Sequence, residues 1–158
     1  MAKDPFAAEV AFHGDSDDIR AILDEMCAAT GMGFCAVARV TDTRWIVAQV
    51  LDRVEFGLKP GDELELKTTI CDEIRDSGRA VVIDHVAGNI EWRTHHTPAL
   101  YGFESYVSIP LFLADGRFYG TLCAIDGSPR PLSAPATVAL LERLAIRAAT
   151  ILSARAGG

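Results

Sequence analysis

The stretch of residues 101–126, YGFESYVSIPLFLADGRFYGTLCAID, decides the fold class of this chain. It contains two runs of strand-forming residues, Ser105–Phe112 and Arg117–Ile125, with an Asp-Gly pair between them. An Asp-Gly pair between apolar runs is typical of a β-hairpin, because Gly116 can adopt a positive φ without steric cost. Polar and small residues interrupt both runs, so we expect one face of this hairpin to have a role beyond packing in the hydrophobic core.

The length and composition indicate one globular domain. At 158 residues, of which 49% are hydrophobic and 23% charged, the chain is long enough to bury a single sizeable core. The formal net charge is −7 and the Lys and Arg residues are scattered, which argues against nucleic acid and anionic membranes as partners. No apolar run approaches the roughly 18 residues that span a bilayer, and the N-terminus lacks the apolar segment of a signal peptide. We therefore expect a cytoplasmic protein.

The four cysteines do not have the spacing of a metal site. Cys27, Cys35, Cys71 and Cys123 each stand alone in an apolar segment, and none belongs to a Cys-x-x-Cys pair. Nothing in the sequence indicates secretion. We therefore expect reduced and mostly buried thiols, no disulfide and no metal.

Turn and cap residues divide the rest of the chain into short elements. Residues 1–14 predict a flexible lead-in, after which Ser16 caps a helix that stops at Gly31. The region 85–102 shows no period but is rich in aromatic residues and histidine, which favours a functional segment. The other predicted elements are strands over Phe34–Val40 and Trp45–Leu51, a short helix ending at Gly78, a strand over Ala80–Ile83 and a long helix over Ala134–Ser153.

This order of elements predicts an α+β fold. An antiparallel β-sheet with the N- and C-terminal helices on one face satisfies the order. The short helix and the 85–102 segment would then cover the other face and leave a hollow for a small ligand. We assign residues 15–153 to this single domain, and residues 154–158 to a tail or the start of a connector.

Several strings of the sequence resemble the GAF domain, a small-molecule sensor module of signalling proteins. They are Ser-x-Pro-Leu before the hairpin turn, Gly-Thr-Leu-Cys-Ala after it, Pro-Arg-Pro-Leu before the last helix, Thr68-Thr-Ile-Cys-Asp-Glu-Ile and Val82-Ile-Asp-His-Val. The resemblance covers nearly the whole chain, and it is strongest to the modules of bacterial sensor histidine kinases and related phosphorelay proteins. It implies a non-catalytic regulatory module that binds an unidentified small molecule and signals through its terminal helices. It also implies a homodimer formed through these helices and an output kinase or other signalling domain in the parent protein.

The resemblance places a ligand site in the hollow but identifies neither the ligand nor a cofactor. Aromatic side chains there could stack on a ligand or simply fill the hollow, and both readings stay open. The predicted ligand-binding residues are Ile70, Cys71, Trp92, His95, His96, Tyr101, Tyr106, Ser108 and Cys123.

The pair His95-His96 decides whether a tetrapyrrole ligand could be bound covalently. In GAF domains of the cyanobacterial photoreceptor type, the cysteine that binds a bilin covalently would stand where His95 lies, counted back from Phe103. A thioether is therefore excluded there, while a non-covalent tetrapyrrole near His96 stays an alternative. A metal site at this pair is disfavoured, because adjacent residues rarely point to one centre.

An alternative function, as an enzyme, depends on Cys71. Free methionine sulfoxide reductases are GAF enzymes, and Cys71 lies roughly where the resemblance places one of their cysteines. Its predicted place at a helix N-terminus would lower the pKa of its thiol. The nucleophilic cysteine of these enzymes would fall at Ala99, however, and that segment contains no cysteine. We therefore expect no enzyme activity and keep two alternatives, a redox-active thiol enzyme and a ligand-free dimerisation module.

Overall fold

In the computed structural model, the described residues are 4–66, 70–88 and 102–155. Among them, six strands form one antiparallel sheet in the order β3-β2-β1-β6-β5-β4. The elements in chain order are α1 (Pro5–Gly14), α2 (Asp17–Thr30), β1 (Phe34–Val40), β2 (Trp45–Asp52), β3 (Glu63–Leu64), α3 (Cys71–Ser77), β4 (Val81–Ile83), β5 (Ser105–Phe112), β6 (Phe118–Asp126) and α5 (Pro135–Arg155).

The hairpin predicted from the sequence lies in the middle of this sheet. β5 and β6 pair from Ser105 opposite Asp126 onward, and β6 also pairs with β1. The turn closes with a hydrogen bond from the Leu113 amide to the Arg117 carbonyl, 2.8 Å long, and Gly116 has a φ of +88°. The positive φ explains why glycine is needed at this turn.

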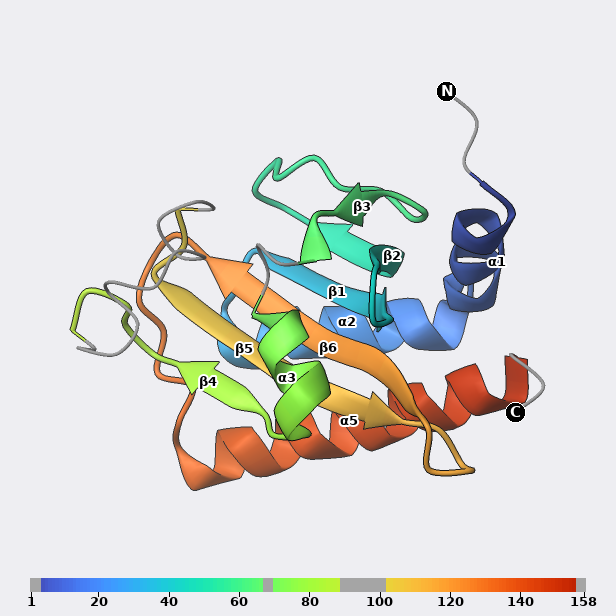
Figure 1. Cartoon of the computed structure of the whole chain (residues 1–158). Helices are drawn as coiled ribbons and strands as arrows, with labels where there is room; N and C mark the ends of the chain where they lie inside the picture. The colour runs from blue at the N-terminus through green and yellow to red at the C-terminus, as the bar shows by residue number, and fades with distance from the viewer. Residues whose placement is uncertain (1–3, 67–69, 89–101, 156–158) are drawn as a thin grey trace.

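Alternate residues of the strands face two different environments, because successive side chains of a strand point to opposite sides. The helices α1, α2 and α5 cover one side of the sheet, and α3 lies over β5 and β6 on the other side (Figure 1). We call the first side the helix face; its buried strand residues are Cys35, Val37, Ile46, Ala48, Val107, Ile109, Leu111, Tyr119, Leu122 and Ala124. We call the second side the pocket face; its strand residues include Phe34, Ala36, Ala38, Trp45, Val47, Tyr106, Ser108, Thr121 and Cys123. The predicted α+β architecture, with terminal helices on one face and the short helix on the other, is confirmed.

Local signals set the ends of the long helices as the sequence predicts. The Ser16 hydroxyl accepts from the Ile19 amide at the start of α2, and Gly31 ends that helix with a φ of +74°. α5 continues to Arg155, two residues beyond the predicted end at Ser153. None of the described helices is both long and apolar enough to cross a membrane.

The prediction of a flexible lead-in over residues 1–14 is wrong for residues 5–14, which form α1. Asp4 caps this helix by accepting from the Ala7 amide at 2.9 Å, and Pro5 takes the first helical position, where proline costs no hydrogen bond. Ala7 and Val10 are buried in the core of the helix face. The helix was missed because only this narrow apolar stripe is buried.

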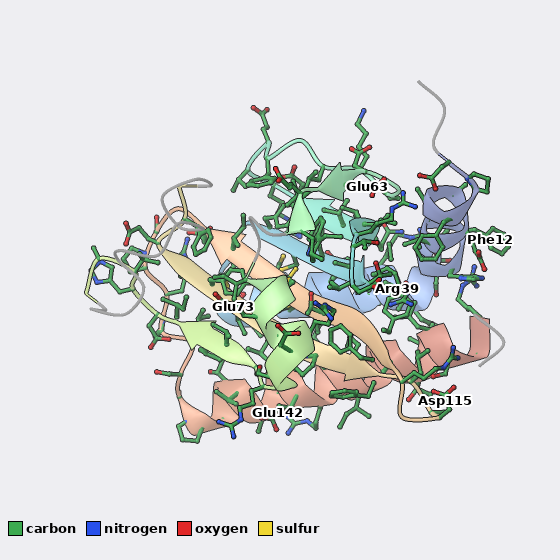
Figure 2. The ribbon with its side chains drawn as sticks, in the orientation of Figure 1. Phe12, Arg39, Glu63, Glu73, Asp115 and Glu142 are labelled. Atoms are coloured by element: carbon green, nitrogen blue, oxygen red, sulfur yellow. The ribbon has the colours of Figure 1, made fainter. Side chains whose placement is uncertain are left out.

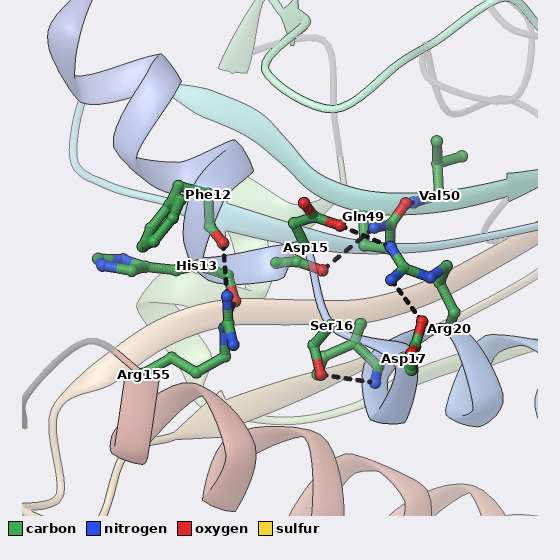
Figure 3. Close-up of polar contacts among 11 residues, drawn as sticks. Phe12, His13, Asp15, Ser16, Asp17, Arg20, Gln49, Val50 and Arg155 are labelled. Atoms are coloured by element: carbon green, nitrogen blue, oxygen red, sulfur yellow. Dashed lines mark hydrogen bonds and ion pairs between the residues drawn. The ribbon is translucent and has the colours of Figure 1, made fainter.

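Contacts with distant parts of the chain hold the end of α1 in place (Figure 3). Arg155, at the end of α5, donates to the carbonyls of Phe12 and His13 at 3.0 and 2.7 Å. The Gln49 side chain of β2 donates to the carbonyl of Gly14 at 3.1 Å. A Cβ at Gly14 would lie 2.2 Å from the Ala48 carbonyl oxygen, so only glycine allows this close approach of α1 to β2. These contacts join the N-terminal helix to the end of the C-terminal helix.

Candidate functional site: a polar cluster on the pocket face

The centre of the pocket face carries a row of hydroxyl and thiol groups. Ser108 of β5 lies directly opposite Cys123 of β6 in the strand register, and Tyr106 and Thr121 are each two residues away along the same strands. All four side chains are buried. Their polar atoms point toward α3 and not toward the helices of the other face.

α3 places the Cys71 thiol over this row. Its Sγ atom lies 3.2 Å from Thr121 Oγ1, 3.6 Å from Tyr106 Oη and 3.7 Å from Ser108 Oγ. The helix begins at Cys71, and the buried Ile70 and Ile74 anchor it against the sheet. Figure 2 shows the exposed Glu73 on this helix, above the sheet and on the side opposite α5. We call Cys71, Tyr106, Ser108, Thr121 and Cys123 the polar cluster.

A small cavity lies beside the polar cluster. Its volume is about 40 Å³, which is room for only a few water molecules. Aromatic and aliphatic side chains form most of its wall, and none of the described residues that line it is charged. The lining residues are Phe34, Trp45, Phe56, Leu58, Leu64, Ile70, Cys71, Tyr106, Cys123 and Ile125.

The indole of Trp45 lines this cavity with a donor that is not used. Trp45 is 3% exposed, and its Nε1 has no hydrogen-bond partner among the described residues. The N–H group favours a negative charge on the Cys71 sulfur electrostatically, although it does not reach hydrogen-bond geometry with that atom. A buried donor without a partner costs free energy, and native proteins rarely leave one unless something else satisfies it.

The polar cluster changes the acidity of its members. Hydrogen bonding by Cys123, together with Thr121 and Tyr106, lowers the pKa of Cys71 to about 6, although burial opposes this shift. The same interaction with Cys71 raises the pKa of Cys123 well above its ordinary value, and burial adds to the effect. Burial, followed by the nearby Cys71 charge, raises the pKa of Tyr106. The cluster therefore holds at most one thiolate, at Cys71, with hydroxyl and thiol donors around it.

The structure brings together five of the nine predicted ligand-binding residues. Ile70, Cys71, Tyr106 and Cys123 line the cavity, and Ser108 contacts the Cys71 thiol. The other four, Trp92, His95, His96 and Tyr101, lie outside the described residues.

Several residues of the site were not predicted from the sequence. Thr121 could have been found from the strand period, because it lies two residues before Cys123 and so shares its face. Trp45 and Phe34 lie at the start of their strands, and their local sequence pattern does not predict which face of the sheet carries the cavity. Phe56 follows β2 in an irregular segment, where no period predicts the direction of a side chain.

The pocket face is connected to the start of α5 by Asp84, which follows β4. Its carboxylate accepts from the Leu132 amide at 3.1 Å and from the Ser133 hydroxyl at 2.6 Å, just before α5 begins. Two residues further on, the Val86 amide donates to the Glu104 carbonyl at 2.7 Å. Both ends of the 85–104 region are thus fixed to the rest of the domain.

A comparison with family models decides the family. The model of the GAF domain matches residues 17–152, which is most of the chain. This chain belongs to the GAF domain family. A comparison with curated proteins found no match.

Solved structures share the fold of this GAF domain at low sequence identity. The GAF domain of a phosphoenolpyruvate-protein phosphotransferase from Acinetobacter has a TM-score of 0.70 and 11% identity, over 98% of this chain and 97% of that one. The GAF domain of a two-component sensor histidine kinase from Bacillus halodurans has a TM-score of 0.66 and 13% identity, over 87% and 92%. A type II free methionine-R-sulfoxide reductase from Thermoplasma acidophilum has a TM-score of 0.66 and 11% identity, over 90% and 94%. Because the same fold occurs in a sensor histidine kinase and in a methionine sulfoxide reductase, the fold alone does not decide the role of this chain.

Proposed function

We propose that this GAF domain is a non-catalytic sensor of a small molecule in a bacterial signal-transduction protein. The observation that carries the proposal is the unpartnered indole N–H of Trp45, a residue that lines the cavity together with Cys71, Tyr106 and Cys123 of the polar cluster. A ligand with one hydrogen-bond acceptor would satisfy this donor, and its apolar part would pack on the aromatic wall. Ligand pockets commonly combine an apolar wall with a few placed polar groups in this way.

The size of the cavity supports a sensing role. About 40 Å³ does not hold a metabolite, so a ligand has to displace part of the wall when it binds. α3 is the element to move, because it is only seven residues long and supplies Cys71. Its movement would pull on β4, which follows it directly in the chain.

The hydrogen bonds of Asp84 give a route from the pocket to α5. Asp84 ends the segment that begins with α3 and β4, and it bonds to Leu132 and Ser133 just before α5 starts. α5 in turn bonds to the end of α1 through Arg155. A ligand that shifts α3 would therefore change the position of the terminal helices. We infer that these helices pair in a homodimer and pass the signal to an output kinase or other signalling domain.

The proposal is tested by native mass spectrometry and an absorption spectrum of the protein purified from bacterial cells, followed by thermal unfolding with a metabolite panel. Trp45→Phe keeps an aromatic ring but removes the N–H donor. We expect a bound small molecule in the wild type and an affinity roughly 2–10-fold lower in Trp45→Phe, as for the loss of one hydrogen bond. A Soret or red absorption band would identify the ligand as a tetrapyrrole.

Tyr119→Phe is the matched control. It also removes a buried polar atom without a partner among the described residues, but on the helix-face side of β6. Its ligand affinity should equal that of the wild type. No bound mass, together with no shift in melting temperature across the panel, would contradict the proposal and favour a ligand-free dimerisation module.

The lowered pKa of Cys71 favours a redox-active thiol enzyme as the second candidate. Reduction of free methionine sulfoxide to methionine and water consumes two thiols and leaves one disulfide, and Cys71 and Cys123 could supply them. Turnover of methionine sulfoxide that is lost in Cys71→Ala would establish this activity. Turnover equal to that without protein would reject it and leave the sensor proposal standing.

A further inference from the structure

A second pair of cysteines meets on the helix face, away from the polar cluster. Cys27 lies in the last turn of α2, and Cys35 is the second residue of β1. Their Sγ atoms are 2.6 Å apart. Both side chains are buried, with 2% and 0% exposed, and they belong to the core between the sheet and the terminal helices. The sequence predicts these two residues only as separate buried thiols.

The connection between the two cysteines is held in place by its own hydrogen bonds. The hydroxyl of Thr30 donates to the Met26 carbonyl at 2.8 Å, and Gly31 ends the helix in the left-handed conformation. The Gly33 amide donates to the buried Asp126 carboxylate of β6 at 3.0 Å. These bonds fix the end of α2 relative to the start of β1, so the approach of the thiols follows from the fold and not from one free side chain.

We propose that Cys27 and Cys35 are a redox-responsive thiol pair that a hydroperoxide converts into a disulfide. A disulfide bond is about 2.05 Å long, so the sulfur atoms need to approach by only about half an ångström. No other atom fits between them.

The surroundings assign different roles to the two thiols. Hydrogen bonding from Cys35 lowers the pKa of Cys27; burial opposes the shift, and the Arg53 charge adds to it. The same interaction raises the pKa of Cys35, and its burial contributes too. Arg53 forms an exposed ion pair with Asp24, 3.3 Å long, next to this end of α2. Cys27 keeps slightly more exposed surface than Cys35, and we assign it the first reaction with the peroxide.

The reaction balances with a hydroperoxide as the only oxidant. The Cys27 thiolate attacks the terminal peroxide oxygen, the O–O bond breaks, and an alcohol or water leaves together with a sulfenic acid on Cys27. The Cys35 sulfur then attacks the Cys27 sulfur, the S–S bond forms, and the hydroxyl group leaves as water with the Cys35 proton. Two thiols are oxidised by two electrons, and the peroxide is reduced by two.

The disulfide would tie α2 to the sheet on the side where signals leave the domain. α2 also contacts α5, where the Arg147 guanidinium bonds to the Glu25 carboxylate at 2.9 Å. Closing a loop between residues 27 and 35 should raise the melting temperature by about 5–10 °C. The pair would thus make the stiffness of the helix face depend on oxidation, independently of a ligand in the pocket.

The experiment uses the full chain, which is first reduced and then exchanged into buffer without reductant. The protein is treated with hydrogen peroxide, and its remaining free thiols are then labelled with N-ethylmaleimide under denaturing conditions. Trypsin leaves both cysteines in one peptide, residues 21–39, while Cys71 and Cys123 fall in two other peptides. We expect peptide 21–39 to lose both labels and to be 2 Da lighter than its reduced form, and dithiothreitol to restore both labels. The melting temperature should rise with the disulfide and return on reduction.

Two variants isolate the pair. In Cys71→Ala/Cys123→Ala only Cys27 and Cys35 remain, and peroxide should reduce the labels per chain from two to zero. In Cys35→Ala the 2 Da loss and the rise in melting temperature should both disappear. The proposal is overturned if peptide 21–39 keeps both labels at peroxide doses that already oxidise Met26 or Met32. It is also overturned if the only disulfide formed joins the Cys71 and Cys123 peptides.

Discussion

The two faces of the sheet each contain a pair of cysteines, but the pairs lie in opposite surroundings. On the helix face, Cys27 and Cys35 meet in a core made of aliphatic side chains from the strands and the terminal helices. On the pocket face, Cys71 contacts three hydroxyl groups, and Cys123 hydrogen-bonds with it. The same strands supply both faces, because alternate residues point in opposite directions.

Under the proposed function, this difference separates the residues that stabilise the fold from those that would recognise a ligand. A filled aliphatic core contributes free energy in proportion to the area that it buries, and it tolerates few changes. The pocket face includes a cavity, an unpartnered donor and a row of polar atoms, which are costly in a protein that only needs to fold. We therefore expect substitutions on the helix face to act on stability and substitutions on the pocket face to act on binding.

The largest expected effect compares two adjacent residues of β6. Leu122 points into the helix-face core with no exposed surface, while Cys123 lies in the polar cluster. Leu122→Ala should lower the free energy of unfolding by about 2–5 kcal/mol, because it leaves a cavity in a packed core. Cys123→Ala should lower it by roughly 1 kcal/mol, because its sulfur already borders a cavity. Urea unfolding of the two variants measures both values; equal losses would show that the two faces do not differ as we infer.

The next expected effect is a pH dependence that belongs to the pocket face. The pKa of Cys71 is about 6 in the folded protein and near 9 for an ordinary thiol. A group whose pKa is lower in the folded state adds stability above its unfolded pKa and loses it as the pH falls through the folded pKa. The free energy of unfolding should therefore rise between pH 6 and pH 9, by at most about 1.4 kcal/mol per pH unit.

Cys71→Ala is the variant that tests this dependence. It should remove the rise in unfolding free energy between pH 6 and pH 9, and with it the thiolate absorbance near 240 nm that develops around pH 6. The helix-face variant Cys35→Ala should keep both. If Cys71→Ala shows the wild-type pH profile, Cys71 is protonated at neutral pH and the polar cluster does not stabilise a charge.

A smaller effect is expected at the junction of the two faces. Asp84 leaves the pocket face with β4 and accepts from Leu132, which is buried in the helix-face core. Asp84→Ala should cost about 1–2 kcal/mol of unfolding free energy, because it removes the carboxylate that accepts from the Leu132 amide and the Ser133 hydroxyl and leaves that amide only its bond to the Arg130 carbonyl. Asp84→Asn keeps one carbonyl acceptor and should cost about half as much.

Hydrogen exchange shows whether this junction transmits a signal. In the wild type, a ligand identified by native mass spectrometry should change the exchange of amides in both α3 and α5. In Asp84→Ala the change should remain in α3 and disappear from α5. A change that persists in α5 would mean that the route through Asp84 is not used.

The sequence predicted the fold better than the site, for a physical reason. The hairpin, the Ser16 cap and the Gly31 stop depend on residues close together in the chain, so local patterns reveal them. α1 was missed because its place depends on long-range partners such as Gln49 and Arg155.

The same reason applies to the two thiol pairs. Cys71 and Cys123 were both predicted as ligand-binding residues, through the GAF resemblance, but their shared hydrogen bonding becomes visible only when α3 lies on the sheet. Cys27 and Cys35 are eight residues apart, on a helix and a strand, and no local period predicts that their sulfur atoms meet. Contacts between elements decide the chemistry of both faces, whereas local patterns decide only the elements.

The smallest expected effect on stability is at the outer surface of α5. Ile146 is 66% exposed and lies one turn after Glu142, and both residues line an open hollow between α5 and β5. Ile146→Glu should change the unfolding free energy by less than about 0.5 kcal/mol, because most of the Ile146 side chain is already exposed to solvent. If the helix face pairs with a second copy, the same change should weaken the dimer at least tenfold, since it places a charge in an apolar interface. Light scattering after size exclusion measures the dimer, and Val54→Glu, at a residue 49% exposed outside the helices, is the matched control that should leave it intact. A wild type that stays monomeric at every concentration would contradict the proposed homodimer.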